Sequence, residues 1–164
     1  MNDLPKRKKL RMKQYNYSDC GLYFVTLCVK DGNELLWNNV KMDCNCLEKV
    51  PELSETGRAI EEEIRRLSQI YENVTVDKYC IMPNHIHMII LILTANNGKE
   101  LTEPTLSRII KQFKGSITKS IGFTIWQKSY YDRIIRNENE YFNIRKYIKE
   151  NALKWEEDEL KAGN

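Results

Sequence analysis

Histidine is almost absent from this chain, which has 2 among 164 residues. Long uncharged apolar runs are missing too: none approaches the roughly 20 residues that span a bilayer, and the basic first residues lead into no apolar signal region. Net charge is also small, at +3, so total charge gives no indication of a nucleic-acid partner. We therefore expect a cytoplasmic protein with no membrane partner, in which imidazole chemistry is confined to one place.

Disulfides are not expected either, because the 5 cysteines are odd in number and come without an export signal. We predict reduced thiols at Cys20, Cys28, Cys44, Cys46 and Cys80. The Cys44 and Cys46 pair has no second Cys/His pair at zinc-finger spacing, so residues 43–46 are interpreted as a loop. A length of 164 residues with 41% apolar content is enough for one core and predicts a single domain.

Charge is distributed unevenly along the chain. Basic residues crowd the start, at Lys6, Arg7, Lys8, Lys9, Arg11 and Lys13, and acidic residues crowd the end, at Glu156, Glu157, Asp158 and Glu159. We expect a basic N-terminal arm at residues 1–20, one domain at residues 21–155 and an acidic C-terminal tail at residues 156–164. Because Tyr15 and Tyr17 follow the cations, the arm suits phosphate contact and base stacking, although a solvated tail has the same composition.

Strand and helix patterns alternate along the rest of the chain. Residues 21–30 are β-branched and aromatic and predict a strand that is closed by turn residues 31–33. Apolar residues at helical spacing predict an amphipathic helix at residues 54–71, and two strands at 74–82 and 86–93 are joined by a tight turn. A second helix follows Pro104, and residues 125–136 predict a last strand. The apolar face of that second helix consists of Leu106, Ile109, Ile110, Phe113 and Ile117.

A final helix is predicted from Asn137, a candidate N-cap, with Glu140 completing a capping box. Its apolar stripe consists of Tyr141, Ile144, Ile148 and Trp155. At about 100° per residue, Tyr147 and Asn151 lie beside this stripe and one turn apart. A phenol and an amide therefore emerge together at the edge of the helix that would pack on the sheet.

The two histidines are His85 and His87, at the start of the second strand of the predicted hairpin. Side chains alternate faces in an extended chain, so this spacing points both imidazoles to the same side. Two neutral imidazoles on one face form half of a divalent-metal site. The solvated face of an edge strand has the same pattern and, on this triplet alone, is an equal alternative.

A metal-binding histidine pair and a tyrosine together indicate phosphoryl transfer to a phenol. Tyrosine is a poor nucleophile near neutral pH because its pKa is about 10, yet its phenolate forms a stable phosphodiester when it attacks a phosphate polarised by a divalent cation. Tyr130 and Tyr131 are rival candidates, but strand positions are rigid and most strand tyrosines pack or stack. We therefore prefer Tyr147, and the reaction class would be DNA strand cleavage and transfer.

Four parts of the chain, in order, resemble one known family. They are residues 15–18 before 21–26; residues 83–88 (PNHIHM), which look like the histidine-hydrophobic-histidine motif of HUH endonucleases; residues 125–136; and residues 147–151 before Trp155. The chain is thus similar to the single-tyrosine transposases of the insertion-sequence type. Among them it most resembles the REP-associated tyrosine transposases, which are associated with repeated extragenic palindromes.

The resemblance implies roles for individual residues. His85 and His87 would bind Mg²⁺ or Mn²⁺, and Tyr147 would be the nucleophile. Asn151 matches the position of a further polar metal ligand, a glutamine in the mobile relatives; because asparagine is shorter by one methylene, it can act through a water instead. Ala152 stands where many relatives have proline, a departure that affects how the helix ends.

The resemblance also implies the fold, an α+β, ferredoxin-like or RRM-like sandwich. Its antiparallel sheet has four to five strands with helices packed on one face, which leaves the other face for nucleic acid or a second subunit. Mobile relatives form dimers that exchange the tyrosine helix, whereas some domesticated ones act as monomers. A homodimer and a monomer therefore both stay open.

The predicted function is that of a transposase: a metal-dependent single-strand DNA endonuclease and strand transferase that cleaves next to palindromic hairpin DNA through a 5′-phosphotyrosine intermediate. The basic arm and the second helix would grip the hairpin stem, and base contacts would read the unpaired flanks. Such a protein would be nucleoid-associated. Beyond the arm, the predicted DNA contacts are Arg108, Lys111, Lys114, Gln127, Tyr130 and Arg133.

Two other classes stay open on the sequence alone. One is a domesticated protein that binds hairpin DNA without cutting it. The other is a replication-initiator-type HUH nickase, which is disfavoured because such enzymes normally sit in larger chains. A histidine-triad phosphohydrolase is disfavoured further, because it needs a third alternating histidine where this sequence has Ile89.

Overall fold

A computed structural model of the protein describes residues 21–38, 41–42, 49–50, 52–93, 105–151 and 154–155. The predicted basic arm and acidic tail lie outside the described residues, as do Cys20, Cys44, Cys46 and Ala152. In the part of the chain that is described, no helix is both long and apolar enough to cross a membrane.

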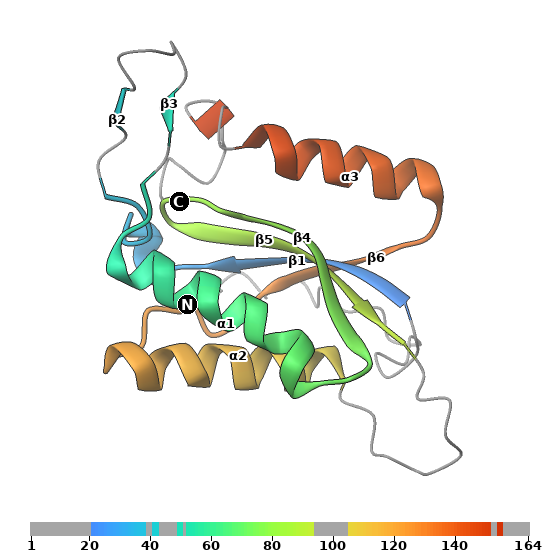
Figure 1. Cartoon of the computed structure of the whole chain (residues 1–164), viewed down its shortest axis with the longest axis horizontal. Helices are drawn as coiled ribbons and strands as arrows, with labels where there is room; N and C mark the ends of the chain where they lie inside the picture. The colour runs from blue at the N-terminus through green and yellow to red at the C-terminus, as the bar shows by residue number, and fades with distance from the viewer. Residues whose placement is uncertain are drawn as a thin grey trace, which may run out of the picture.

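An antiparallel sheet of four strands forms the centre of the fold. Its strands are β1 (Gly21–Cys28), β4 (Val74–Ile81), β5 (His85–Ile92) and β6 (Tyr131–Ile135), in the spatial order β4-β5-β1-β6 (Figure 1). β2 (Lys41–Met42) and β3 (Lys49–Val50) pair separately. The predicted tight turn joins β4 to β5, where the Met82 N–H donates to the His85 carbonyl at 2.8 Å. The predicted α+β fold with an antiparallel sheet is confirmed.

Two helices cover one face of this sheet and enclose the main core. They are α1 (Glu55–Ile70) and α2 (Leu106–Ile121), and each begins at a hydroxyl N-cap. The Ser54 hydroxyl accepts from the Gly57 N–H at 3.1 Å, and the Thr105 hydroxyl accepts from the Arg108 N–H at 3.2 Å. The five apolar residues predicted for the second helix are all buried on α2, which confirms its amphipathic face.

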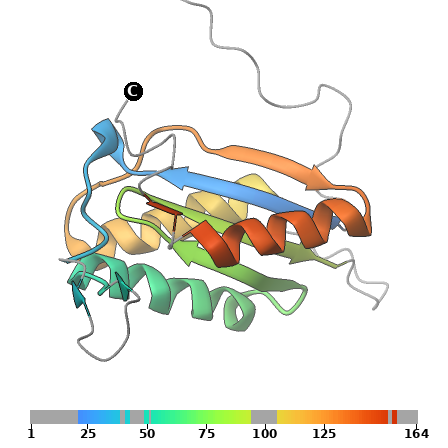
Figure 2. The same cartoon turned by 90° about the horizontal axis from the view of Figure 1, so that it is seen from above.

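The third helix, α3 (Glu138–Asn151), lies on the opposite face, so the expectation that the helices share one face holds for α1 and α2 only (Figure 1). Figure 2 shows it crossing the sheet over β4 and β5. The physical reason is that the central strands carry apolar side chains on both faces: Val25 belongs to the main core, whereas Ile89 forms a second, smaller cluster with Ile135 and Ile148.

A polar contact also fastens α3 to β4. The strand has a register irregularity between Val76 and Lys78, and the side chain of the intervening Asp77 reaches the helix. The Tyr141 hydroxyl donates to Asp77 Oδ2 at 3.0 Å, and Arg145 Nη1 lies 3.6 Å from Asp77 Oδ1. The helix is therefore held by an apolar cluster and by one carboxylate.

The last strand is shorter than predicted, because residues 125–130 are largely irregular. Trp126 makes a single bridge with Val29, after which the Lys114 ammonium donates to the carbonyls of Gln127 and Ser129 at 2.8 and 3.0 Å. The Lys114 ammonium thus donates to carbonyls that, in a regular strand, would accept from the N–H groups of a neighbouring strand. Regular pairing therefore begins only at Tyr131.

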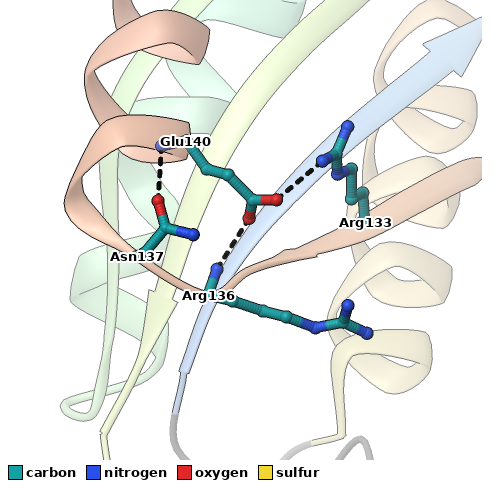
Figure 3. A network of polar contacts seen from close by, with 4 residues as sticks. All are labelled: Arg133, Arg136, Asn137 and Glu140. Atoms are coloured by element: carbon teal, nitrogen blue, oxygen red, sulfur yellow. Dashed lines mark hydrogen bonds and ion pairs between the residues drawn. The ribbon is translucent and has the colours of Figure 1, made fainter.

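The start of α3 also differs in one respect from the predicted capping box. The Asn137 side chain accepts from the Glu140 N–H at 2.9 Å, as expected for an N-cap. The Glu140 carboxylate, however, accepts from the Arg136 N–H at 2.9 Å and pairs with the Arg133 guanidinium at 2.7 Å (Figure 3). Glu140 thus ties the helix to the end of β6 instead of closing a reciprocal box with Asn137.

Candidate active site

The predicted histidine pair faces the same side of the sheet, toward α3. On β5, His87 is the cross-strand partner of Thr26 and His85 is the partner of Cys28. Both imidazoles are buried, with 0% of His85 and 3% of His87 exposed. Their Nε2 atoms lie 3.1 Å apart, so the two potential ligand atoms converge on one point. The sheet thereby confirms the orientation that alternation predicts.

The second ring nitrogen of each imidazole, Nδ1, also has a polar partner. His85 Nδ1 lies 2.7 Å from Asn84 Oδ1, and His87 Nδ1 lies 2.8 Å from Thr26 Oγ1. Burial, and secondly the neighbouring His85, lowers the pKa of His87 from 6.5 to about 3. His87 is therefore neutral near neutral pH, which is the form of imidazole that binds metals.

The tyrosine predicted as nucleophile lies beside this pair. The Tyr147 hydroxyl is 3.3 Å from His87 Nε2, and the two rings are 5.3 Å apart. Phe24 of β1 meets the same tyrosine ring edge-on at 6.3 Å. Ile148, next in the helix, is buried in the small cluster and fixes the helix rotation, while 46% of Tyr147 is exposed. The phenol is thus both next to the histidines and open to a large substrate.

Asn151 is buried one turn after Tyr147, with 3% of its surface exposed. It is the last residue of α3, and Tyr147, one turn earlier, lies beside His87. Trp155, predicted on the apolar stripe of the helix, lies beyond its end in the main core instead, with its ring 6.0 Å from that of His85. Its Nδ2 has no hydrogen-bond partner among the described residues. An amide buried without full satisfaction is costly in a purely structural role, so this side chain is a candidate member of the site.

The geometry of the donor atoms fits a divalent cation. Two nitrogens that are each about 2.1 Å from one cation lie about 3.0 to 3.4 Å apart at octahedral and tetrahedral angles, and the observed Nε2 separation is 3.1 Å. Among the described residues no group of three His, Cys, Asp or Glu side chains converges as metal ligands. Any third ligand from this part of the chain would therefore have to be another type of group, such as the Asn151 amide, or else water or substrate.

The residues predicted to contact DNA are placed on different sides of the sheet. Arg108 and Lys111 lie on exposed positions of α2, away from the histidine face. Lys114 binds the carbonyls of residues 127 and 129, and burial lowers its pKa. Tyr130 packs near the main core, with its hydroxyl 3.1 Å from Ser107 Oγ. These positions leave contact with DNA by the α2 residues as a prediction.

Gln127 and Arg133 are two further residues that were predicted to contact DNA. The Gln127 amide donates to the Val29 carbonyl at 3.5 Å, a contact within the protein. Arg133 projects from the edge strand on the histidine face, where it pairs with Glu140. The arm cations lie outside the described residues.

Two residues at the site were not given a role by the sequence, and the rival candidate Tyr131 lies on the same face as them. Asn84 and Thr26 hold the imidazoles, and Tyr131, 49% exposed, is the β6 partner of Thr26 on the same face. A polar threonine inside an apolar strand and an asparagine next to His85 were available signals. The pairing of Thr26 with His87 could not be read from the sequence, because it depends on the register between distant strands.

A four-stranded antiparallel sheet with a histidine pair and a helical tyrosine on one face is the architecture expected for single-tyrosine transposases. Comparison with known proteins agrees: the model of a family described as "Transposase IS200 like" matches residues 48–151. The chain belongs to this family of transposases.

The chain is also similar to other proteins in sequence and in fold. The sequence is 31% identical over 173 residues to an uncharacterized protein of Haemophilus influenzae, covering 94% of this chain and 92% of that one. Among solved structures the fold is similar to that of a REP-associated tyrosine transposase bound to a REP hairpin. That match has a TM-score of 0.59 and 17% sequence identity, and covers 88% of this chain and 74% of the other.

Proposed function

We propose that this transposase cleaves a single DNA strand with Tyr147 as nucleophile, while His85 and His87 hold Mg²⁺ or Mn²⁺. The observation that carries this proposal is the convergence of the Tyr147 hydroxyl and His85 Nε2 on His87 Nε2, at 3.3 and 3.1 Å. Asn151 would complete the ligand set through its amide oxygen or through a water. The cation would polarise the scissile phosphate and stabilise its developing charge.

The chemical step uses this chain's own phenol. Tyr147 gives up its hydroxyl proton, and its oxygen forms a bond to phosphorus on the side opposite the leaving 3′ oxygen. The P–O3′ bond breaks, and the 3′ oxygen takes up a proton and leaves as a hydroxyl. The protein is then joined to the 5′ phosphate through a phosphotyrosine, whose retained bond energy allows a later 3′ hydroxyl to reverse the step.

Hairpin DNA is the proposed substrate. The solved transposase with a similar fold is bound to a REP hairpin, and the basic arm at residues 1–20 supplies cations for the phosphates of a duplex stem. The half-exposed Tyr147 is open to a strand of DNA, and the resemblance to single-strand endonucleases implies that this strand is an unpaired flank. The scissile phosphate would therefore lie in single-stranded DNA next to the hairpin.

The test is covalent capture on a denaturing gel. Single-stranded DNA carrying palindromes from the flanking genomic sequence is incubated with the protein and Mn²⁺. The wild type should form a protein–DNA adduct that Tyr147→Phe cannot form and that a chelator prevents. Tyr131→Phe is the matched control, because it removes a hydroxyl from an equally exposed tyrosine on the same face and should retain the adduct.

An adduct formed by Tyr147→Phe would refute the assignment of the nucleophile. Hairpin binding that resists both a chelator and His85→Ala, with no adduct on any palindrome, would instead establish a protein that binds hairpins without cutting them. Adduct formation by His85→Ala at the wild-type rate would refute the role of the histidine pair.

A further inference from the structure

We propose that the two histidines differ in tautomeric freedom: His85 is fixed with its proton on Nδ1, whereas His87 can carry its proton on either nitrogen because Thr26 accommodates both. The assignment of Asn84 and Thr26 as positioning residues follows from the hydrogen bonds around them. Its consequence for metal loading rests on the proposed function, but the tautomers themselves are a property of the metal-free protein.

The tautomer of His85 is fixed through Asn84, whose side chain contacts a turn with left-handed backbone angles. Asp31 and Gly32 have φ values of 59° and 68°, and the Gly32 carbonyl lies 3.3 Å from Asn84 Nδ2. A carbonyl can only accept, so the Asn84 amide must donate there, and this decides which way the amide faces. Asn84 Oδ1 is then the atom that lies 2.7 Å from His85 Nδ1.

An amide oxygen can only accept, so His85 Nδ1 must carry the proton. Asn84 is 3% exposed and its backbone carbonyl accepts from the Val29 N–H at 2.8 Å, so the side chain has little freedom to turn away. His85 Nε2 is left with a lone pair, aimed at His87. This imidazole is therefore held in the tautomer that a metal ligand through Nε2 requires.

His87 meets a different kind of partner. Its Nε2 lies 3.1 Å from His85 Nε2, and in metal-free protein this contact is attractive only if His87 Nε2 carries the proton, since two facing lone pairs would repel. The Tyr147 oxygen, 3.3 Å from His87 Nε2, can accept from the same proton. His87 Nδ1 is then unprotonated and accepts from the Thr26 hydroxyl at 2.8 Å. A shared cation reverses this arrangement, because both Nε2 lone pairs are then needed and the His87 proton must sit on Nδ1.

A hydroxyl is the side chain that can serve both arrangements, since it donates in one and accepts in the other. The imidazole is neutral in both, so the change moves a proton within the ring system without altering net charge. Thr26 is 7% exposed, and no bulk water is needed to satisfy His87 Nδ1 in either state. Thr26 thus allows His87 to change tautomer when a cation binds. Asn84, in contrast, holds His85 in the metal-binding tautomer before the cation binds.

Nitrogen NMR of the imidazole rings tests this directly, because the chain has only 2 histidines and hence four ring nitrogens to distinguish. In chelator near neutral pH, we expect His85 to be protonated on Nδ1 and His87 on Nε2. Assignment uses His87→Gln, in which the remaining His85 should keep its Nδ1 proton because Asn84 still faces it. On addition of Mg²⁺ the His87 proton should move to Nδ1 while His85 stays unchanged.

Metal affinity, measured by the decrease of the free Mn²⁺ electron paramagnetic resonance signal, gives a second readout. Loss of a residue that orients a metal ligand typically weakens metal binding by about 10- to 100-fold. Thr26→Val, nearly isosteric, should weaken Mn²⁺ binding by at least about tenfold, whereas Thr26→Ser, which keeps the hydroxyl, should stay within about threefold. Asn84→Leu, which loses the acceptor for His85 Nδ1, should weaken binding similarly.

Finding the His85 proton on Nε2, or the His87 proton on Nδ1 in chelator, would overturn the inference, and this measurement needs no variant to fold. Wild-type affinity in folded Thr26→Val would overturn the role of Thr26. If the wild type binds neither Mg²⁺ nor Mn²⁺ but shows the expected tautomers, then the metal part of the proposed function fails and the hydrogen-bond inference stands.

Discussion

Replacing Ile148 by alanine should release the tyrosine helix without unfolding the protein. Ile148 is 2% exposed and packs with Ile89 and Ile135 in the small cluster under α3. That cluster is separate from the main core, which α1 and α2 cover on the other face of the sheet. A cavity made at Ile148 therefore weakens the attachment of one helix and leaves the larger core intact.

The expected magnitude follows from burial. A buried Ile→Ala change costs about 2 to 5 kcal/mol, and a value near 3 kcal/mol corresponds to about a hundredfold change in an equilibrium constant at about 1.4 kcal/mol per tenfold. Because the contact of Tyr141 with Asp77 survives in the variant, we expect α3 to open locally about a hundredfold more often. Adduct formation should fall with it, since Tyr147 depends on this helix.

Native-state hydrogen exchange is the appropriate assay, because it reports opening element by element. Amides of α3 should exchange about a hundredfold faster in Ile148→Ala, while those of β1 and β5 change much less. Phe142→Ala is the matched control on the same helix: Phe142 is 61% exposed, so its removal leaves no buried cavity. Unchanged exchange in α3, or equal acceleration in α3 and the central strands, would refute the separation of the two clusters.

Two other predictions concern acid and a glycine. In chelator, the pKa of His87 is about 3 in the folded protein and 6.5 in the unfolded chain, so the unfolded chain binds more protons between these pH values. The contribution of His87 to stability should therefore be full above pH 6.5 and decline as the pH falls toward 3. The free energy of unfolding, measured by urea denaturation at pH 7 and pH 4, should fall less in His87→Gln than in the wild type, by a few kcal/mol. Equal declines in the two proteins would refute this prediction. Gly57→Ala should destabilise the protein although alanine favours helices, because the added Cβ would collide with the Leu36 carbonyl oxygen; Gly115→Ala, with open space around it, should be neutral or stabilising in the same thermal melt.

The sequence predicted those features that depend on local periodicity. Alternation along β5 placed both histidines on one face, and helical spacing placed Tyr147 and Asn151 on the inner edge of α3. The Asn137 cap of α3 and the turn at Pro83 and Asn84 were likewise local and present. Such features need only the geometry of one element.

Features that depend on which elements meet were not predictable in the same way. Both faces of β1 and β5 are apolar, so the pattern could not tell which face α3 would cover. Composition could not distinguish a lysine that reaches phosphate from Lys114, which holds two backbone carbonyls. The partners of the imidazoles required the register of Thr26 opposite His87 and the approach of Gly32 to Asn84.

The link between β6 and α3 consists of only two residues, 136 and 137. At about 3.3 to 3.6 Å per residue, such a tether reaches roughly 7 Å, and Glu140 further shortens it by tying the helix to Arg136 and Arg133 (Figure 3). A helix on so short a link lies close to the end of β6, and its phenol reaches the sheet of its own chain. In the described structure this link thus places Tyr147 beside the two histidines of the same chain, and a longer link would let the helix lie farther from its own sheet.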